Sequence, residues 1–250
     1  KWDITNTLNF RAEYGFDLLT QDEQHYQNSK TLSGRSVGGY GSSRWVQIFN
    51  YTTKGYFNWS PDLGADNDLN VVLGVEFQES TRKQSNVEGQ GYPVDQLKTV
   101  ASASEIVVGS STLNEFAFVG YFLRANYKLF NKFLVGATVR VDGSSRFGEN
   151  NKYGTFPSAS VGYILSEESF LSGSDVLSFL KVRASYGLTG NAEIGNYNTY
   201  GTFTSATYNN GAGLAPSQIA NPDLTWETTA QMNLGLDFGF FNDRLTGGFD

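Results

Sequence analysis

The sequence predicts an all-β protein: an antiparallel up-and-down transmembrane β-barrel, of which this chain forms a partial wall. Apolar and polar residues alternate over long stretches, and because a strand has a period of two residues, each stretch has one apolar and one polar face. Several stretches meet or exceed the ~9–11 tilted residues that cross a membrane. The connections between them alternate between short and long, as in outer-membrane barrels.

Composition agrees with this fold class. The 250 residues include 28 Gly, 14 Tyr and 19 Phe, which favour strands and turns over helices. Mean hydropathy is -0.34, which suits a barrel because only alternate residues of each strand meet lipid. A net charge of -7 argues against a nucleic-acid partner, since such partners require basic faces. The absence of Cys removes disulfides and cysteine-ligated metals.

Three strands are expected in the first part of the chain. The stretch Ile4–Leu18 alternates apolar residues with Thr, Asn, Arg, Glu and Asp. Trp45–Trp59 places its aromatic residues in one register, and Leu69–Phe77 does the same with Leu, Val and Phe. A loop at 83–114 follows, which is too long for a hairpin turn, and we expect a short helix within it at 94–103.

Six further strands bring the expected total to about nine, although closed bacterial barrels have an even number. Each has apolar residues at alternate positions opposite polar ones. These strands are Ala117–Leu129, Phe133–Val141, Pro157–Leu165, Leu180–Leu188, Trp226–Phe240 and a last one that starts at Leu245.

The connections fall into two classes. Those at 60–68, 130–132, 166–178 and 241–244 are short or moderate, and those at 19–43, 83–115, 144–152 and 190–223 are mostly longer. Short turns of outer-membrane barrels face the periplasm, and aromatic girdles mark both membrane surfaces. The inner girdle is expected to contain Phe57, Trp59, Phe133, Tyr163, Phe238 and Phe240. The outer girdle is expected to contain Tyr14, Phe16, Trp45, Tyr186 and Trp226.

Two other classes of protein share parts of this pattern. A soluble all-β glycan-binding sandwich also has alternating strands but buries its apolar register between two sheets. A smaller outer-membrane barrel that serves as an enzyme or an adhesin would need no plug. Catalytic motifs are absent, and His25 is the only histidine, so we expect no enzyme activity, no catalytic or metal-binding residues and no cofactor.

Three blocks carry a family resemblance. The stretch Arg140–Val161, RVDGSSRFGENNKYGTFPSASV, resembles the DGSSRFG…YGxFPSxS signature of the SusC/RagA family of TonB-dependent outer-membrane transporters. Leu180–Asn191 and Asn221–Gln231, the latter followed by Leu234–Phe238, resemble two more of its blocks. The resemblance implies a 22-stranded barrel with an amino-terminal plug. Residues 1–250 would be part of the barrel domain of a longer protein, without the plug domain and the barrel carboxyl terminus.

This resemblance implies TonB-dependent import of a bulky nutrient, an oligosaccharide or a peptide, across the outer membrane of a Gram-negative, Bacteroidota-like bacterium. The implied partners are a SusD-like lipoprotein on the extracellular loops, TonB through the plug region, and outer-membrane lipid. Loop aromatic residues that could contact substrate are Tyr197, Tyr200, Phe203 and Tyr208.

The polar register supplies a second set of candidates. These residues are expected to face the lumen and to contact the plug or the wall, or else to form exposed ion pairs of small energetic effect. They are Arg11, Glu13, Lys54, Glu76, Arg124, Arg140, Arg183, Glu227 and Asp237. In the signature block, Arg146 stands among small residues and could tie neighbouring loops together.

Overall fold

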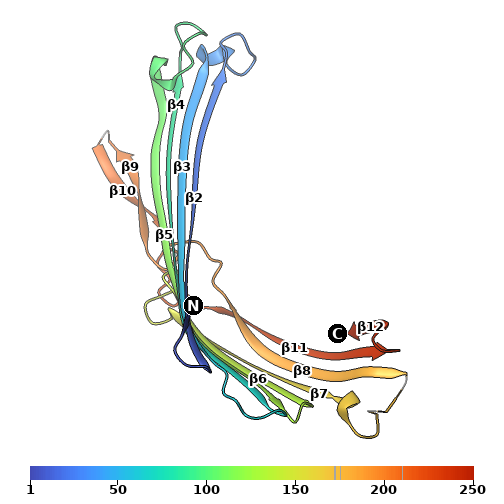
Figure 1. Cartoon of the computed structure of the whole chain (residues 1–250). Helices are drawn as coiled ribbons and strands as arrows, with labels where there is room; N and C mark the ends of the chain where they lie inside the picture. Colours follow the sequence, from blue (N-terminus) through green and yellow to red (C-terminus); the bar gives the residue numbers. More distant parts are fainter. Residues whose placement is uncertain (172, 175, 210) are drawn as a thin grey trace. The chain divides into compact units, whose positions relative to one another are not determined.

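The computed structural model describes residues 1–171, 173–174, 176–209 and 211–250, and strands dominate it (Figure 1). The first strands are β1 (Trp2–Asp3), β2 (Leu8–Gln27), β3 (Tyr40–Trp59), β4 (Asp68–Gln90) and β5 (Glu105–Leu129). Shorter strands follow: β6 (Phe133–Ser144), β7 (Tyr153–Ile164), β8 (Leu177–Asn191), β9 (Thr202–Tyr208), β10 (Gly211–Gln218), β11 (Glu227–Phe240) and β12 (Leu245–Phe249). Three short 3-10 turns are η1 (Arg35–Val37), η2 (Val100–Ser102) and η3 (Leu165–Glu167).

The main sheet has ten strands in the order β1-β2-β3-β4-β5-β6-β7-β8-β11-β12. Each strand pairs with its neighbour in sequence, except that β8 pairs with β11, because β9 and β10 form a separate two-stranded sheet. The pairs with an assigned register are antiparallel. This confirms the antiparallel up-and-down topology, and the nine expected strands are all present.

The first strand differs from the expectation. It was predicted to start at Ile4, but β2 starts at Leu8, and Trp2 of β1 lies opposite Phe10. The backbone N–H groups of Ile4 and Thr5 both donate to the carbonyl of Leu8, at 2.9 and 3.0 Å. A tight turn therefore begins the chain, and the apolar side chain of Ile4 fitted the alternation only by chance.

The loops are shorter than predicted. Those expected at 19–43 and 83–114 are reduced because β2, β4 and β5 continue into them. In place of the helix expected at 94–103, the structure has only the single turn η2. Alternation fails there because residues 19–27 and 83–90 are mostly polar, and because Ile106, Val107 and Val108 put apolar side chains on both faces of β5. The strands continue nevertheless. The expected loop at 190–223 also contains the hairpin of β9 and β10.

The chain forms two compact units. Unit 1 comprises Lys1–Glu13, Thr53–Phe77 and Phe118–Asp250, and unit 2 comprises Tyr14–Thr52 and Gln78–Ala117. In β4 the apolar register Leu69–Phe77 ends at the boundary between the units, and in β5 the apolar register begins at Ala117.

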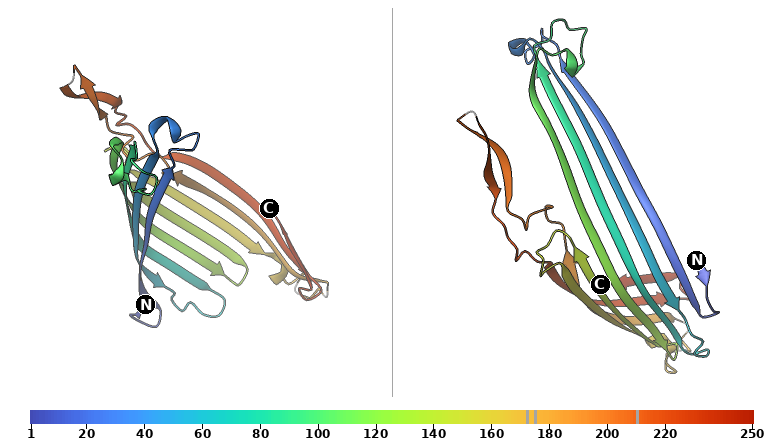
Figure 2. Two further views of the ribbon diagram at one scale, coloured as in Figure 1. Left: turned by 90° about the horizontal axis from the view of Figure 1, so that it is seen from above. Right: turned by 90° about the vertical axis from the view of Figure 1, so that its left-hand side faces the viewer.

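Unit 1 carries an exposed apolar face. In the sheet, β6, β7, β8 and β11 lie side by side (Figure 2), and their register aligns Val135, Val161, Ala184 and Leu234 in one row. The exposed fractions of Val135, Val161 and Leu234 are 48%, 56% and 61%. These side chains therefore face outward, and no layer of the described residues covers them.

A soluble sandwich would bury this register, and the structure contradicts that alternative. Among the described residues, the apolar side chains that are buried are only Val46, Tyr92, Phe147 and Phe156. The described strands form one large sheet and one hairpin, so no second sheet covers the apolar face.

The short turns of unit 1 are linked to one another. The N–H of Asn131 donates to the carbonyl of Asp66 at 3.0 Å, and the N–H of Ile164 donates to the carbonyl of Lys132 at 2.9 Å. The Lys132 ammonium also lies 3.1 Å from the Glu168 carboxylate. Phe133 and Tyr163, two of the expected girdle residues, stack with ring centroids 4.7 Å apart. The turns thus form one continuous rim.

Unit 2 has a small core at its loop end. Tyr92 is 7% exposed, and its ring meets that of Tyr26 edge to face at a centroid distance of 5.0 Å. Asp95 accepts hydrogen bonds from the Tyr26 hydroxyl at 2.9 Å and from the N–H of Ser29 at 3.0 Å. The loop after β4 is thereby fastened to the loop after β2. Gly41 lies beneath the Tyr92 hydroxyl, where a Cβ atom would collide with it.

Candidate functional site

The polar face of unit 1 is arranged in transverse rows, because directly opposed residues of paired strands project to the same side. Two central rows cross β5, β6, β7, β8 and β11. One row is Arg124, Thr138, Ser158, Gly187 and Gln231, and the next is Asn126, Gly136, Ser160, Ser185 and Asn233.

A charged group, the Arg140 cluster, lies on one side of the central rows. It consists of Arg140, Asp142, Glu76, Phe118 and Phe122. Arg140 Nε donates to both carboxylate oxygens of Asp142, at 2.6 and 2.8 Å, and one Nη donates to Glu76 at 3.2 Å. The guanidinium also lies 5.8 and 6.0 Å from the ring centroids of Phe118 and Phe122. Asp142 is only 7% exposed, so this carboxylate depends on Arg140 for its charge partner.

A second charged group, the Arg183 cluster, lies on the other side and consists of Arg183, Lys181, Asp237 and Asp250. Asp237 lies 2.9 Å from Lys181 Nζ and 3.2 Å from Arg183 Nε, and Arg183 reaches Asp250 at 2.7 Å. Gly235 faces Arg183 across the ladder, and a Cβ atom there would press into the guanidinium. The glycine makes room for the arginine to lie flat on the sheet.

Between these clusters, the central rows have unused hydrogen-bonding groups. Within the described part of the chain, the side chains of Asn126, Ser160, Ser185 and Asn233 make no hydrogen bond or ion pair. Small residues such as Gly136 leave the surface hollow, with two adjoining depressions of about 390 and 370 Å³. The central rows can therefore bind a polar group from outside the chain.

The expected polar-register residues do not form one site. Arg11 pairs with Glu13 at 2.8 Å, and both side chains are about half exposed. Glu227 accepts a hydrogen bond from the amide of Asn191 at 3.1 Å. Arg124 lines the second depression and has no charged partner among the described residues. Lys54 lies 6.0 Å from the centroid of the Phe122 ring.

The signature block forms an aromatic cluster where β6 and β7 meet the long loops. Phe147 is 2% exposed, and its ring centroid lies 4.7 Å from that of Trp226, while Phe156 lies 5.2 Å from Trp226. Phe156 lies opposite Arg140 in the register and therefore shares the polar face. The prediction that Trp226 belongs to the outer girdle is wrong, since this residue precedes β11 and packs into the cluster.

Arg146 ties two loops together, as its place among small residues suggested. Its Nε donates to Asn196 Oδ1 at 2.7 Å and an Nη donates to the carbonyl of Ala192 at 3.0 Å. Burial lowers the pKa of the Arg146 guanidinium, although Glu193 acts in the opposite direction. The N–H of Gly148 donates to the carbonyl of Leu224 at 3.1 Å, so a third segment joins this junction.

The four loop aromatic residues lie in or before the β9–β10 hairpin and do not close one pocket. Phe203 and Tyr208 are 64% and 86% exposed, and they project from opposite faces because their positions differ by an odd number. Tyr197 and Tyr200 come before β9, and the Gln218 amide donates to the carbonyls of both, at 3.1 and 2.8 Å.

Sequence reasoning missed Phe118, Phe122, Phe147 and Phe156. The available signal was the presence of Phe118 and Phe122, four residues apart, in the otherwise polar register of β5. An aromatic residue in a polar register indicates that a neighbouring side chain covers it, and here that side chain is Arg140.

The described residues contain no helix with the length and hydrophobicity of a membrane span. No group of three or more His, Cys, Asp or Glu side chains lies close enough together there to hold a metal ion.

Comparison with known proteins identifies relatives of the whole chain. TonB-dependent receptor SusC of Bacteroides thetaiotaomicron is 36% identical over 227 residues, which cover 87% of this chain and 22% of that protein. TonB-dependent receptor P3 of Formosa agariphila is 31% identical over 255 residues, covering 100% of this chain and 25% of the relative. The chain thus spans about a quarter of the length of these curated relatives.

Solved structures give the same result. A chain in the structure of the RagAB peptide transporter superposes with a TM-score of 0.91 at 28% identity, covering 98% of this chain and 28% of that one. The RagAB peptide importer in its "open-open" state gives a TM-score of 0.87. The sequence matches the family described as TonB dependent receptor-like, beta-barrel over residues 1–250, and the chain belongs to that family.

Proposed function

We propose that this chain forms part of the wall of a TonB-dependent importer in the outer membrane of a Gram-negative, Bacteroidota-like bacterium. The importer carries a bulky nutrient, an oligosaccharide or a peptide. The observation that carries the proposal is the exposed apolar row of Val135, Val161 and Leu234 in unit 1, opposite a face of charged and amide side chains. The apolar face meets lipid and the polar face lines the lumen.

Strand lengths support this assignment. The strands β6, β7, β8 and β11 have 12, 12, 15 and 14 residues, enough for the ~9–11 that cross a membrane. The strands β2 to β5 have 20 to 25 residues. The surplus belongs to unit 2, where β4 beyond Phe77 has polar residues on both faces except at Val87. This end of β4 therefore lies in water, outside the lipid.

The polar face suits a plugged lumen. The Arg140 and Arg183 clusters satisfy their charges within the wall, whereas Arg124 and the amides of Asn126 and Asn233 remain available. These free groups are the ones that would hydrogen-bond a plug domain, through which TonB would act. The same lumen-facing register also contains Glu227, Asp237, Arg11 and Glu13. These side chains mainly contact partners within the wall itself.

The hairpin of β9 and β10 supports contact with a second protein. A two-stranded hairpin is at best marginally stable alone in water, and here it exposes Phe203, Tyr208 and Leu214, the last at 77%. We propose that a SusD-like surface lipoprotein covers these loops. The loop residues that would contact the cargo beneath it are Tyr197, Tyr200, Phe203 and Tyr208.

Single-cysteine labelling tests the membrane assignment, because the chain contains no Cys of its own. Val161→Cys in the full-length protein should react with a lipid-phase maleimide and resist a water-soluble one in intact membranes. Ser85→Cys, in β4 of unit 2, is the matched control and should react with the water-soluble reagent. Equal, fast reaction of both variants with the water-soluble reagent contradicts the proposal.

Uptake tests the transport activity. Cells that express the full-length protein should accumulate labelled oligosaccharides or peptides only when TonB and the proton gradient are intact. The lipoprotein should co-purify with the receptor, and replacement of residues 202–218 by a Gly/Ser linker should weaken that co-purification. Uptake that persists without TonB would exclude this mechanism.

A further inference from the structure

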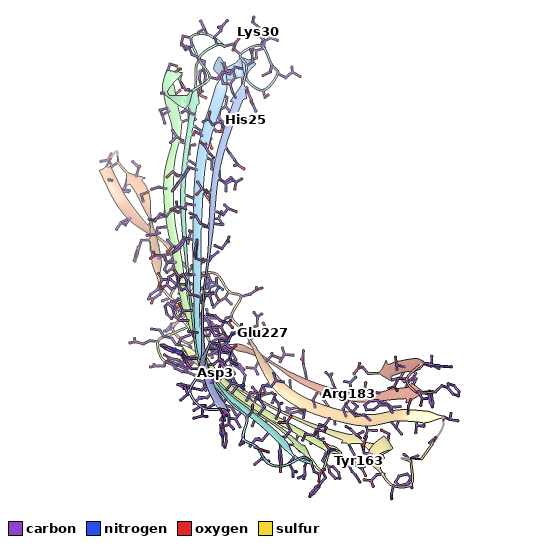
Figure 3. The ribbon with its side chains drawn as sticks, viewed as in Figure 1. Asp3, His25, Lys30, Tyr163, Arg183 and Glu227 are labelled. Atoms are coloured by element: carbon purple, nitrogen blue, oxygen red, sulfur yellow. The ribbon has the colours of Figure 1, made fainter. Side chains whose placement is uncertain are left out.

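The chain leaves the main sheet after β8 and returns to it at β11, and the intervening residues 192–226 contain the β9–β10 hairpin. The base of this excursion is closed. Glu227, the first residue of β11 (Figure 3), lies opposite Asn191 in the ladder and accepts a hydrogen bond from its amide at 3.1 Å. We call residues 192–201 the incoming stem and residues 219–226 the outgoing stem. Both stems and the hairpin belong to unit 1.

The incoming stem is held by Arg146, which lies in the loop between β6 and β7. The Arg146 side chain donates to Asn196 at 2.7 Å and to the carbonyl of Ala192 at 3.0 Å, so it contacts the stem at two positions four residues apart. The N–H of Arg146 donates to the hydroxyl of Ser144, a buried residue at the end of β6, at 3.3 Å. Because the donors of a guanidinium form a rigid planar fork, these contacts fix the direction of the stem as well as its position.

The outgoing stem is held by the same loop. The Asn151 amide donates to the carbonyl of Asp223 at 3.1 Å, and the N–H of Gly148 donates to the carbonyl of Leu224 at 3.1 Å. Gly148 is buried against this stem, and a Cβ atom there would collide with the carbonyl of Pro222. The loop can therefore approach the stem this closely only with glycine at position 148.

The two stems are also bonded to each other, whereas the hairpin beyond them is free. The N–H of Asn221 donates to the carbonyl of Thr199 at 3.2 Å, and Thr199 is buried. The Gln218 amide donates to two carbonyls of the incoming stem, at 3.1 and 2.8 Å. Among the described residues at 202–209 and 211–217, no side chain makes a hydrogen bond or ion pair outside the hairpin. The hairpin is thus an arm with a fixed base and free sides.

We propose that residues 145–152, the clamp, hold the β9–β10 hairpin as a preformed docking arm for the lipoprotein, with Arg146 as a positioning residue. This inference rests on the proposed function, because that proposal supplies the partner of the hairpin. A loosely attached arm would lose conformational freedom when the lipoprotein bound, and an arm that is already fixed avoids this cost. The clamp acts through the stems, so it needs no contact with the lipoprotein.

Distances between two spin labels report the position of the arm and require no ligand. The full-length protein in nanodiscs would carry labels at Ser205→Cys in β9 and Thr155→Cys in β7, both in unit 1. Arg146→Gln and Asn151→Ala should each broaden the distance distribution about twofold, because the base of the arm loosens. Asn150→Ala is the matched control and should leave the width unchanged, since the exposed Asn150 makes no hydrogen bond among the described residues.

The second measurement is the rate at which the co-expressed SusD-like lipoprotein dissociates from the same nanodiscs. Arg146→Gln and Asn196→Ala should each raise this rate about tenfold. Asn196→Asp keeps an acceptor for Arg146 Nε and should stay within about twofold of the wild type. Because Arg146 acts partly through Asn196, the double variant Arg146→Gln/Asn196→Ala should dissociate no faster than Arg146→Gln alone. A general defect of the loops would not be rescued by the aspartate.

Three results would overturn the inference: the distance distribution is unchanged in Arg146→Gln and Asn151→Ala, it broadens without faster dissociation, or Asn196→Asp dissociates as fast as Asn196→Ala. If Arg146→Gln does not assemble, Asn151→Ala and Asn196→Ala decide, because each removes a single side-chain contact with a stem. A wild-type receptor that binds no lipoprotein contradicts the proposed function instead, and the spin-label distances still show whether the clamp fixes the arm.

Discussion

The two units contain the same kind of antiparallel sheet, but the side chains on their faces suit different surroundings. In unit 1 the residues of one face are apolar and exposed, such as Val161, and those of the other are paired charges, such as Arg183 with Asp237. In unit 2 the residues of β4 beyond Phe77 are polar on both faces except at Val87, and a small core forms around Tyr92 and Tyr26. The difference shows that backbone pairing continues along a strand while the side chains change with the surroundings.

Stability must therefore come from different sources in the two units. In unit 1 no second layer of described protein covers the apolar face, so lipid has to supply the apolar contact. In unit 2 the loops are held by hydrogen bonds such as those of Asp95 with Tyr26 and Ser29. Variants that insert a charge or remove one should accordingly act differently in each unit.

The largest effect is expected from a charge on the apolar face of unit 1. Val161→Arg should destabilise the full-length protein by about 2–4 kcal/mol in lipid, because a guanidinium near the middle of the bilayer loses its hydration. Ser85→Arg, on an exposed position of β4 in unit 2, should change stability by less than about 0.5 kcal/mol. Urea unfolding in lipid vesicles measures the change in stability of both variants. Equal changes would show that Val161 and Ser85 lie in the same surroundings.

The next largest effect is expected in the Arg140 cluster. Arg140→Gln removes the charge partner of Asp142, which is buried, and should cost about 2 kcal/mol, below the roughly 3–5 of a fully buried pair because Arg140 itself is about one-third exposed. Arg124→Gln is the matched control, since Arg124 projects from the same face without a charged partner and should change stability little. Similar losses for the two variants would mean that the cluster has no special structural role.

The sequence alone predicts most of unit 1 and much less of unit 2. The strands of unit 1 alternate with few exceptions, such as Phe118 and Phe122, and their register correctly separates Arg140 and Arg183 from Val135 and Val161. In unit 2 the alternation continues through Tyr14–Leu18 of β2 and Trp45–Tyr51 of β3 but is lost in 83–90 and 105–114. Residues 83–90 and 105–114 therefore looked like loop although they form strands.

The aromatic cluster of the signature block could not be located from periodicity. Trp226 fits the apolar register of the strand that follows, but β11 begins one residue later, and the ring turns toward Phe147 and Phe156. A contact of this kind joins segments about 70 or more residues apart in sequence, and local alternation contains no information about it. For the same reason the hydrogen-bonding partners of Arg146 were not predictable individually.

A smaller and local effect of pH is expected in unit 2. The N–H of Ser29 and the hydroxyls of Tyr26 and Ser29 lower the pKa of the Asp95 carboxyl below its usual 3.8. Because the pKa of Asp95 is lower in the folded state, its ionised carboxylate stabilises the folded loop fully above the unfolded-state pKa. This stabilisation is lost as pH falls through the lower folded-state pKa. The protection factor of the Ser29 amide, which is its intrinsic exchange rate divided by the observed rate, should therefore fall below about pH 4.

The matched variant for this pH effect is Asp95→Asn. It retains an oxygen that accepts from Ser29 but does not titrate, so the exchange at the Ser29 amide should lose the acid-dependent step. If the step persists in Asp95→Asn, another group is responsible for the opening of this loop.

The smallest effect is expected for the ion pair of Arg11 and Glu13 in unit 1. Its atoms are only 2.8 Å apart, yet the side chains are 54% and 45% exposed, so water screens the attraction. Glu13→Gln should cost about 0.2–1 kcal/mol, and the loss should shrink further at high salt. The Tyr56 hydroxyl, 3.2 Å from Glu13, can still donate to the amide oxygen of the variant. A loss as large as that of Arg140→Gln would instead require that something outside this chain encloses the pair, and a plug domain bound against Arg11 would do so.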